Sequence, residues 1–397
     1  MSTIKVNKIE NTATTDGGVA IDATGHVTVD GVQLPTAGAL SNRNLIINGA
    51  MQVAQRGTSS TSTGYQTVDR FNLSFSGLNE SATQSQVDVA SGTTPYSLGF
   101  RKAFKITNGN QTSIESGDHI KFNQIIEAQN LAQSGWDYTS SSSYVTLQFW
   151  IKSSVSQNFY LRLTTFDGTQ YSYVIETGTL TADTWTQVTK AIPGNSNLTF
   201  NNDNGQGLLV EFTPFRGTST TGTRPLNAWA AFNSATRVPD MTSTWYTTND
   251  ATLELTGFSL EVGEKATPFE HRSYGDELAR CQRYFQHSFQ GAPGTGNTNN
   301  DGIVMFGGGA TGVTTSFIGA AHVQINPEMR ATPTITLYDL ANPRNTGKCR
   351  RHVYGVPGGD NQGTVITDQN PKSFLVRSDS GHSGSGIIFH YEVASEL

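Results

Sequence analysis

The sequence is poor in charge and in cysteine. Aspartate, glutamate, lysine and arginine make up 15% of its 397 residues. An ordinary soluble domain has roughly 25%, so this surface must consist largely of hydroxyl and amide groups. The cysteines, Cys281 and Cys349, form neither a disulfide framework nor a metal-ligand spacing. We therefore expect two buried or unreactive thiols, no metal site and no cofactor.

The negative net charge and the absence of two sequence signals each argue against a class of protein. The net charge is −6, whereas a nucleic-acid groove needs a basic stripe that displaces counterions from phosphates. The same charge argues against electrostatic adhesion to anionic lipid. An apolar run of about 18 residues, as a membrane-spanning helix needs, is absent, and the N-terminus lacks the order of a secretory signal. We expect no nucleic-acid partner and no membrane insertion.

Residues 1–43 show a pattern of short strands. Apolar residues stand two apart and are separated by glycine-containing turns: Ile4 and Val6, Val19 and Ile21, Val27 and Val29. Strands this short cannot bury an apolar stripe alone. One interpretation is a docking and trimerising segment in which Ile4, Val6, Val27 and Val29 contact other subunits. The alternative is a flexible tail that is merely rich in small polar residues.

Residues 44–270 carry the strand signals of a β-sandwich. In residues 144–152 one face of the expected strand is apolar (Val145, Leu147, Phe149 and Ile151), and the other carries Thr146, Gln148, Trp150 and Lys152. The closing strand, ATLELTGFSLEV, changes phase at Thr256 and Gly257, which predicts a β-bulge at Gly257. The expected fold class is all-β, with a double-sheet domain of jelly-roll type.

A helix is expected in the linker of residues 271–290. Ser273 and Asp276 have the spacing of a capping box. Tyr274, Leu278, Cys281 and Phe285 fall on one apolar stripe of a helix of about fourteen residues. Because so short a helix is marginal alone in water, the stripe must pack on something. It covers either the flank of its own chain or two symmetry mates in a three-helix collar, where these four residues are subunit contacts.

The last stretch, residues 291–397, predicts a small β domain after a Gly/Asn-rich linker. Pro327 and Pro333 predict a turn or an edge, and the final strand carries Ile387, Phe389, Tyr391 and Val393 in phase. The expected loop at 342–354 holds the densest basic cluster, with candidate ligand-binding residues Arg344, Lys348, Arg350 and Arg351, followed by His352. These cations could hold phosphates or carboxylates of a polysaccharide. A solvated or subunit-bridging loop is the alternative.

Several stretches resemble a known group of proteins. NLIINGAMQVAQRG (residues 44–57) followed by VDRF (68–71) resembles the opening of a carbohydrate-binding-module-like domain in tail fibres and receptor-binding proteins of tailed bacteriophages. SLEVGEKATPFEHRSYGDELARCQRYF (259–285) resembles the closing strand and exit of that domain. STIKVNKIEN near the N-terminus resembles fibre heads, and NPEMRATPTITLYD resembles the opening of small β tip domains.

The resemblance implies a structural virion protein, made in the host cytoplasm, that attaches a phage to its host. A homotrimer would then join a tail adaptor, nozzle or other virion protein through its N-terminus and bind host surface polysaccharide or lipopolysaccharide. Alternatives are a capsid-surface decoration protein with the same domains, or a glycan depolymerase. The sequence lacks a long β-helix repeat and a G-x-S-x-G motif, so we expect a protein that is not an enzyme.

A sugar site on a sandwich needs aromatic faces for the pyranose rings and amides for directional hydrogen bonds. The turn-rich stretch 217–250 offers an aromatic-plus-amide set: Trp229, Phe232, Asn233, Trp245 and Tyr246. The alternative is that these side chains close the end of the sandwich or meet a neighbouring subunit. Trp150 and Trp185 lie inside strand patterns, which favours a packing role for both.

Overall fold

The computed structural model describes residues 8–10, 18–21, 27–29, 32–33, 42–289, 302–306, 320–341, 344–352, 359–378 and 386–397. The predicted contact residues Ile4 and Val6 lie outside these ranges. Within them, no helix is long and apolar enough to cross a membrane.

The chain divides by its internal contacts into two compact units. The sandwich unit comprises Met1–Gln52, Thr61–Gly64 and Asn72–Arg272, and the C-terminal unit comprises Val53–Ser60, Tyr65–Phe71 and Ser273–Leu397. Residues 53–60 and 65–71 therefore belong with a part of the chain that follows them by about two hundred residues, a grouping that no sequence pattern indicated.

The N-terminal strands form a small antiparallel sheet. Its order is β1 (Lys8–Glu10), β2 (Gly18–Ile21), β3 (Val27–Val29) and β4 (Val32–Gln33), so the predicted short strands at Val19 and Val27 are confirmed. Ile9 pairs with Val19, and Val19 pairs with Val29. These three side chains share one face of the sheet, and they remain 63%, 37% and 36% exposed.

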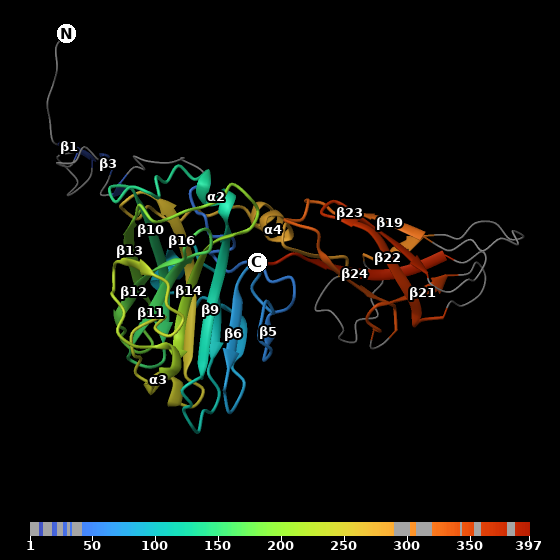
Figure 1. Cartoon of the computed structure of the whole chain (residues 1–397), viewed down its shortest axis with the longest axis horizontal. Coiled ribbons are helices and arrows are strands. Elements are labelled where there is room, and N and C mark those ends of the chain that lie inside the picture. Colours follow the sequence, from blue (N-terminus) through green and yellow to red (C-terminus); the bar gives the residue numbers. More distant parts are fainter. Residues whose placement is uncertain are drawn as a thin grey trace, which may run out of the picture. The chain divides into compact units, whose positions relative to one another are not determined.

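Two antiparallel sheets form the sandwich, which confirms the predicted all-β fold (Figure 1). The β10 sheet contains, in spatial order, β13 (Thr186–Pro193), β10 (Tyr144–Ser153), β16 (Thr252–Val262), β8 (Lys102–Thr107), β7 (Thr83–Asp88) and β5 (Ser59–Ser60). The β14 sheet contains β15 (Trp229–Ala231), β12 (Tyr171–Thr179), β11 (Asn158–Thr165), β14 (Gln206–Arg216), β9 (His119–Glu127) and β6 (Asn72–Ser76). Figure 1 shows β12, β11, β14, β9 and β6 side by side in that order.

Aromatic rings from both sheets fill the space between them. Phe149 of β10 stacks on Phe258 of β16 with ring centroids 4.7 Å apart, and Phe149 also meets Phe212 of β14 at 6.3 Å. The predicted bulge at Gly257 is confirmed, because the β10–β16 register shifts there and Gly257 has a φ of +67°. The bulge turns Phe258 and Leu260 inward, where they are 2% and 0% exposed.

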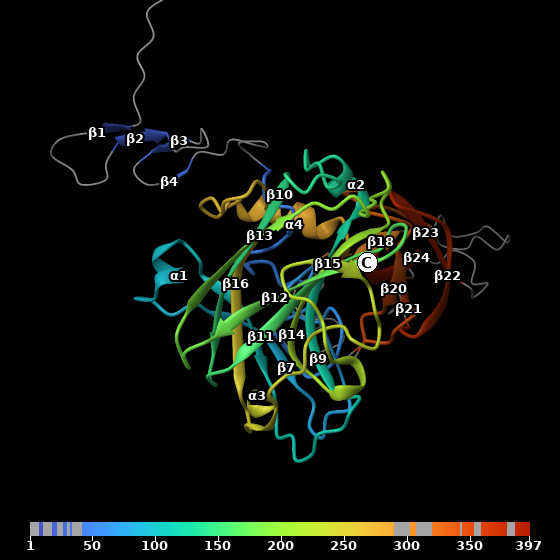
Figure 2. The same ribbon diagram turned by 60° about the vertical axis from the view of Figure 1, so that its left-hand side comes forward.

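Helices are short and lie at the ends of strands. They are α1 (Thr94–Ser97), α2 (Ala128–Ala132), the 3₁₀ turn η1 (Thr218–Thr220), α3 (Thr244–Thr247) and α4 (Tyr274–Gln282). Figure 2 shows α2 near one end of the strands and α3 near the other. The predicted start of α4 is confirmed, because the Ser273 hydroxyl accepts a hydrogen bond from the backbone N–H of Asp276.

The predicted apolar stripe of that helix is wrong in two respects. The helix has nine residues, so Phe285 lies in the following strand β17 (Phe285–His287). Tyr274 is 56% exposed, whereas Cys281 and Phe285 are 0% and 3% exposed and Leu278 is half-buried. Cys281 and Phe285 are thus covered by their own chain and cannot contact another subunit. The helix ends at Gln282, and Tyr284, just before β17, and Phe285, its first residue, are buried at 1% and 3% exposure.

The C-terminal unit is a second β structure. Its strands are β17, β18 (Val304–Phe306), β19 (Ala320–Gln324), β20 (Thr334–Tyr338), β21 (Lys348–His352), β22 (Gln362–Asn370), β23 (Ser373–Ser378) and β24 (Gly386–Ala394). β24 pairs with β17, β18, β20 and β21. Its residues Ile387, Phe389 and Val393 enter the core of this unit, as the predicted final strand requires.

Two arginines join the early segments to the rest of the C-terminal unit. Arg70 is 1% exposed, and its guanidinium carbon lies 3.4 Å from the ring centroid of Tyr284. The guanidinium of Arg56 lies 3.5 Å from the ring centroid of Phe285. Both arginines form ion pairs with Glu396. Residues 53–60 and 65–71 are therefore held by cation–π contacts and a shared carboxylate.

Candidate functional site

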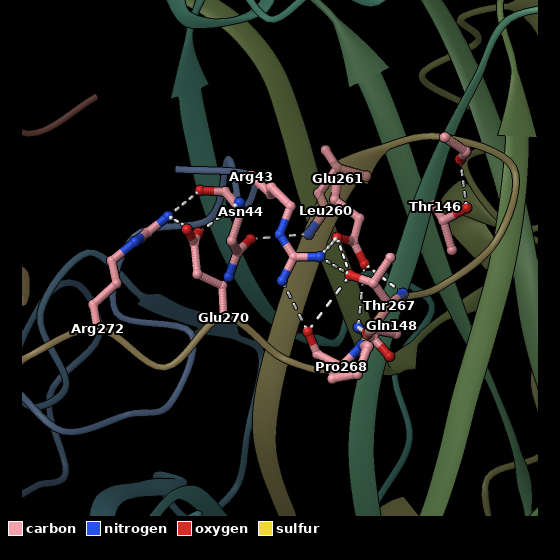
Figure 3. Close-up of polar contacts among 11 residues, drawn as sticks. Arg43, Asn44, Thr146, Gln148, Leu260, Glu261, Thr267, Pro268, Glu270 and Arg272 are labelled. Atoms are coloured by element: carbon pink, nitrogen blue, oxygen red, sulfur yellow. Dashed lines mark hydrogen bonds and ion pairs between the residues drawn. The ribbon is translucent and has the colours of Figure 1, made fainter. Parts of the chain in front are cut away.

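The outer face of the β10 sheet is crossed by the segment that follows β16. Residues 263–272, called here the exit segment, turn back over the polar side chains of β10 (Figure 3). The Thr146 hydroxyl donates to the Gly263 carbonyl at 2.7 Å, and Gln148 Nε2 donates to the Thr267 carbonyl at 2.7 Å. The outward half of the residue 144–152 pattern is thus used to hold this segment in place.

A buried carboxylate fixes the centre of the exit segment. Glu261 is 3% exposed. It accepts hydrogen bonds from the backbone N–H of Thr267 at 2.9 Å and from the Thr267 hydroxyl at 2.6 Å. Arg43 Nη1 lies 3.5 Å from Glu261 and also donates to the Thr267 hydroxyl oxygen. Figure 3 shows these groups converging between β10 and β16. A charged acceptor with several donors is among the stronger hydrogen-bonding arrangements in proteins.

The start of the sandwich is tied to the same segment. Asn44 donates from its side chain to the Phe258 carbonyl and accepts from the Leu260 N–H, both at 3.0 Å. Its backbone N–H donates to Glu270 Oε2 at 3.0 Å, and Arg272 pairs with Glu270 at 3.0 Å. Burial alone would raise the pKa of Glu270, but these partners outweigh it and lower the pKa. Two stretches that carried the resemblance in sequence therefore lie against each other.

A pocket of about 640 Å³ lies beside the exit segment on the outer face of the β10 sheet. It is lined by Leu98, Phe100, Gln148, Trp150, Gln187, Thr189, Gly257, Lys265, Ala266, Thr267, Pro268, Phe269 and His271. We call it the β10 pocket. Its volume falls within the ~300–1,000 Å³ of typical small-molecule sites.

One side of the β10 pocket is aromatic. The ring centroids of Phe100 and Phe269 are 4.9 Å apart, and those of Phe100 and His271 are 5.1 Å apart. His271 Nε2 lies 2.9 Å from the Leu98 carbonyl, which fixes the imidazole orientation. Trp150 is 9% exposed and packs in the cluster that contains Phe100. Phe269 is half-buried and His271 is exposed, so both rings present area to solvent at the rim.

The other side of the pocket is a row of amide and hydroxyl groups. In the β10–β13 register, Gln148 stands opposite Thr189, and Trp150 stands opposite Gln187. Gln187 Nε2 donates to Gln148 Oε1 at 3.2 Å. Because Gln148 also donates to the exit segment, the Gln187 amide is oriented by a chain of hydrogen bonds. Gln187 and Thr189 are both exposed and can meet a ligand.

The bulge at Gly257 makes room for the aromatic side. A Cβ atom on Gly257 would stand 2.7 Å from Phe100 Cζ and 3.2 Å from Trp150 Cδ1. The positive φ of this residue is also unfavourable for other residue types. The phase change at Gly257 therefore has two consequences. It directs Phe258 into the core, and it leaves space for the rings of Phe100 and Trp150 to pack over β16.

Trp245 and Tyr246, predicted as ligand-binding residues, are fully buried, at 0% exposure. Trp245 donates from Nε1 to the Thr252 carbonyl at 3.1 Å. Tyr246 stacks on Phe215 with centroids 4.0 Å apart and donates its hydroxyl proton to Asp118 at 2.9 Å. This part of the prediction is wrong. Both rings close an end of the sandwich, because α3 places these two consecutive aromatic residues against the ends of the strands.

The other members of that predicted set do not reach the β10 pocket. Trp229 donates from Nε1 to the Pro193 carbonyl at 2.7 Å and packs against Tyr173, so its polar atom is already used. The side-chain oxygen of Asn233 accepts from the Ala235 N–H at 2.9 Å. Phe232 is half-buried on the β14 sheet side, next to charged residues described below.

The basic cluster of the C-terminal unit is a strand rather than a loop over residues 348–352, where it forms β21. Arg350 makes two hydrogen bonds of 2.6 Å to the Asp360 carboxylate. The Arg344 guanidinium lies 5.4 Å from the Phe289 ring centroid. Because strand residues alternate between faces, Lys348 and Arg350 point away from Arg351. The predicted cluster is thus divided, and its best-placed guanidinium is already paired.

The residues of the β10 pocket were missed as a site. The residue 144–152 pattern places Gln148 and Trp150 on the polar face of its strand, and Phe269 and His271 lie in the stretch 259–285 that resembles the domain exit. The sequence did not indicate that the exit segment folds back over the polar face of β10, and this fold brings the four residues together.

No protein-family model matches the sequence, and no curated protein sequence matches it. Solved structures provide distant similarities. Over 55% of its length the chain is similar to the enzymatically active domain of tailspike protein 4 from bacteriophage CBA120, with 10% identity and a TM-score of 0.30. The match spans 21% of that tailspike chain.

The chain is also similar to carbohydrate-binding domains. It is similar to a xylan-binding domain from Paenibacillus barcinonensis with 9% identity and a TM-score of 0.26, over 59% of this chain and 100% of that one. It is also similar to the N-terminal cellulose-binding domain of a Cellulomonas fimi β-1,4-glucanase, with 10% identity and a TM-score of 0.25, over 54% and 99%. A function for this chain must be judged on its own side chains.

Proposed function

We propose that the sandwich binds a neutral saccharide in the β10 pocket. The observation that carries the proposal is the pairing of rings with oriented amides in one pocket. Phe269 and His271 stand on one side, and Gln187 and Thr189 stand on the other. Apolar sugar faces pack on aromatic rings, and sugar hydroxyls exchange hydrogen bonds with amides. Each contact is worth about 1 kcal/mol, which gives weak binding per site.

We further propose that the protein is a virion attachment fibre that presents this pocket to a host glycan. The resemblance of the N-terminus, of both ends of the sandwich and of the C-terminal opening to phage fibres supports this role. The exposed apolar face at Ile9, Val19 and Val29 supports assembly with further copies, because such a face is stabilised when it is covered. A trimer with several weak sites gains avidity through effective concentration. Catalysis is not part of the proposal.

The test is a glycan-array screen followed by titration of the strongest neutral ligand with the full-length protein. His271→Ala and Gln187→Ala are each expected to weaken binding about fivefold to tenfold, since each removes one contact of about 1 kcal/mol. Tryptophan emission is a suitable signal, because all five tryptophans lie in the sandwich unit and Trp150 lines the pocket.

Matched controls keep the residue type and change the place. His322→Ala removes an exposed histidine of the C-terminal unit, and Gln206→Ala removes an exposed glutamine at the start of β14. Both are expected to bind like the parent protein. Equal affinity in all four variants, or no neutral glycan bound at any concentration tested, would show that the pocket is not the site.

A further inference from the structure

The outer face of the β14 sheet carries a second group of functional side chains, buried around one carboxylate. Arg162 of β11 stands directly opposite Glu211 of β14, and its Nη2 lies 2.9 Å from Glu211 Oε1. Arg216 Nη2 lies 3.3 Å from the same oxygen. The exposed fractions of Arg162, Arg216 and Glu211 are 3%, 4% and 1%.

Positive charge exceeds negative charge around this carboxylate. Lys121 of β9 lies on the same face. The charged groups that act on the Lys121 ammonium are the negative Glu211 and the positive Arg216, Arg237 and Arg162. Burial lowers the pKa of Lys121, and the guanidinium groups add to this effect while Glu211 opposes it. We call this set the cationic face. Like charges held together in a low-dielectric site are costly unless an anion joins them.

Polar atoms of the cationic face also lack partners. The Nε atoms of Arg162 and Arg216 and the Oγ1 atom of Thr213 are buried and have no hydrogen-bond partner within the described part of the chain. Thr213 follows Glu211 by two residues and therefore shares its face of β14. Buried polar groups are normally satisfied by protein, water or ligand. The two unpartnered guanidinium nitrogens show that Glu211 and its neighbours satisfy the donors of Arg162 and Arg216 only in part, so positive charge remains beneath the surface of this face.

An aromatic ring completes the face. Phe232, half-buried, has the Arg162 guanidinium 5.3 Å and the Arg237 guanidinium 5.9 Å from its ring centroid. The neighbouring cavity of about 290 Å³ is lined by Arg216 but also by the carboxylates of Asp240 and Glu115. Because those carboxylates repel an anion, the favoured position is over Lys121 and Arg237, which are both partly accessible.

We propose that the cationic face binds an acidic saccharide through a carboxylate or phosphate group, with the sugar ring resting on Phe232. Arginine matches both anions because its planar donor groups form paired hydrogen bonds. Here Lys121 and Arg237 contact the ligand, while Arg162 and Arg216 set the field beneath it. This site is separate from the β10 pocket, lies on the other sheet, and takes a different class of ligand. It therefore goes beyond the proposed function and does not depend on it.

The test is calorimetric titration of the full-length protein with D-glucuronate and with D-glucose 6-phosphate, each compared with D-glucose. At least one acidic sugar is expected to bind at low salt and to weaken as salt rises. Lys121→Gln together with Arg237→Gln is expected to weaken that binding at least tenfold. The ligand that binds distinguishes a carboxylate site from a phosphate site.

The control is Arg101→Gln together with Lys105→Gln, which removes the same charge near or on the β10 sheet and should leave acidic-sugar binding unchanged. Phe232→Ala provides a second variant that keeps every charge and should weaken binding severalfold. Absence of binding by both acidic sugars, or equal losses in the two glutamine pairs, would overturn the proposal. Loss of neutral-glycan binding in the β10 pocket variants would bear only on the proposed function, so the two failures are distinguishable.

Discussion

The role of some single residues in this protein could not be predicted from the residue type or from the sequence around it. Glu211 is a strand residue within an apolar pattern, GLLVEF, yet it is the buried counter-ion of two arginines. Burial alone would raise its pKa, but Arg162, Arg216 and Lys121 outweigh that effect and lower the pKa to about 2. A carboxylate held in this way stabilises the fold in its ionised form.

The pH dependence of the sandwich unit should follow Glu211. A pKa lowered from 4.5 to about 2 gives stability that is fully present above pH 4.5 and is lost as the pH falls towards 2. By proportion this is about 3 kcal/mol of unfolding free energy. Chemical denaturation followed by tryptophan emission from pH 7 to pH 2.5 measures it.

Glu211→Gln removes the titrating group and is the natural comparison. It should be destabilised at pH 7, because two buried arginines lose their partner, and its stability should fall less steeply below pH 4.5. A variant with the same acid dependence as the parent would refute the role given to Glu211.

Gly257 is the second residue whose role depends on its surroundings. Gly257→Ala should lower the unfolding free energy by about 1–3 kcal/mol, through backbone strain and contact with Phe100, and should weaken ligand binding in the β10 pocket. Gly92→Ala is the matched control. Gly92 has a φ of +83°, but a Cβ there meets nothing within 4 Å. Equal losses in the two variants, measured by thermal unfolding and titration, would mean that the pocket rings are not crowded by residue 257.

At the scale of elements, local signals were most reliable where a strand or cap is set by its neighbours in sequence. The Ser273 cap and the in-phase final strand β24 were both predicted from adjacent residues, and the expected turn or edge at Pro327 and Pro333 falls in the break between β19 and β20. The length of α4 was not, because Tyr284 and Phe285 gain more burial in and beside β17 than in a longer helix. Competition between elements is invisible to a periodicity argument.

The ion cluster of the C-terminal unit offers a prediction at this scale. Glu396→Gln leaves Arg56 and Arg70 without their shared carboxylate and should destabilise the unit by about 3 kcal/mol. Hydrogen exchange should accelerate in β17 and β24. Glu328→Gln is the control, because Glu328 is 51% exposed and lies 3.6 Å from an exposed lysine. Unchanged exchange in the first variant would show that the cation–π contacts suffice.

At the scale of the whole molecule, the exposed apolar face of the N-terminal sheet is the feature on which the proposed assembly with further copies depends. The chain has a mass of 42.7 kDa, so a trimer should scatter light as a particle of about 128 kDa. If the chain is an attachment fibre, as proposed above, deletion of residues 1–41 is expected to abolish its incorporation into virions while glycan binding by the sandwich persists. A full-length protein that is monodisperse at the mass of one chain would contradict the assembly proposed here.

The sequence by itself determined the class of the fold, its strand-rich units, the bulge at Gly257 and the start of α4, because each follows from side-chain period, turn residues or caps within a few positions. The tertiary structure alone decided which side chains meet. It folded the exit segment over Gln148, buried Trp245 and Tyr246, and placed Lys121, Arg162 and Arg216 around Glu211. The physical reason is that such contacts join residues tens to hundreds of positions apart, and strand register, which no local pattern contains, brings them together.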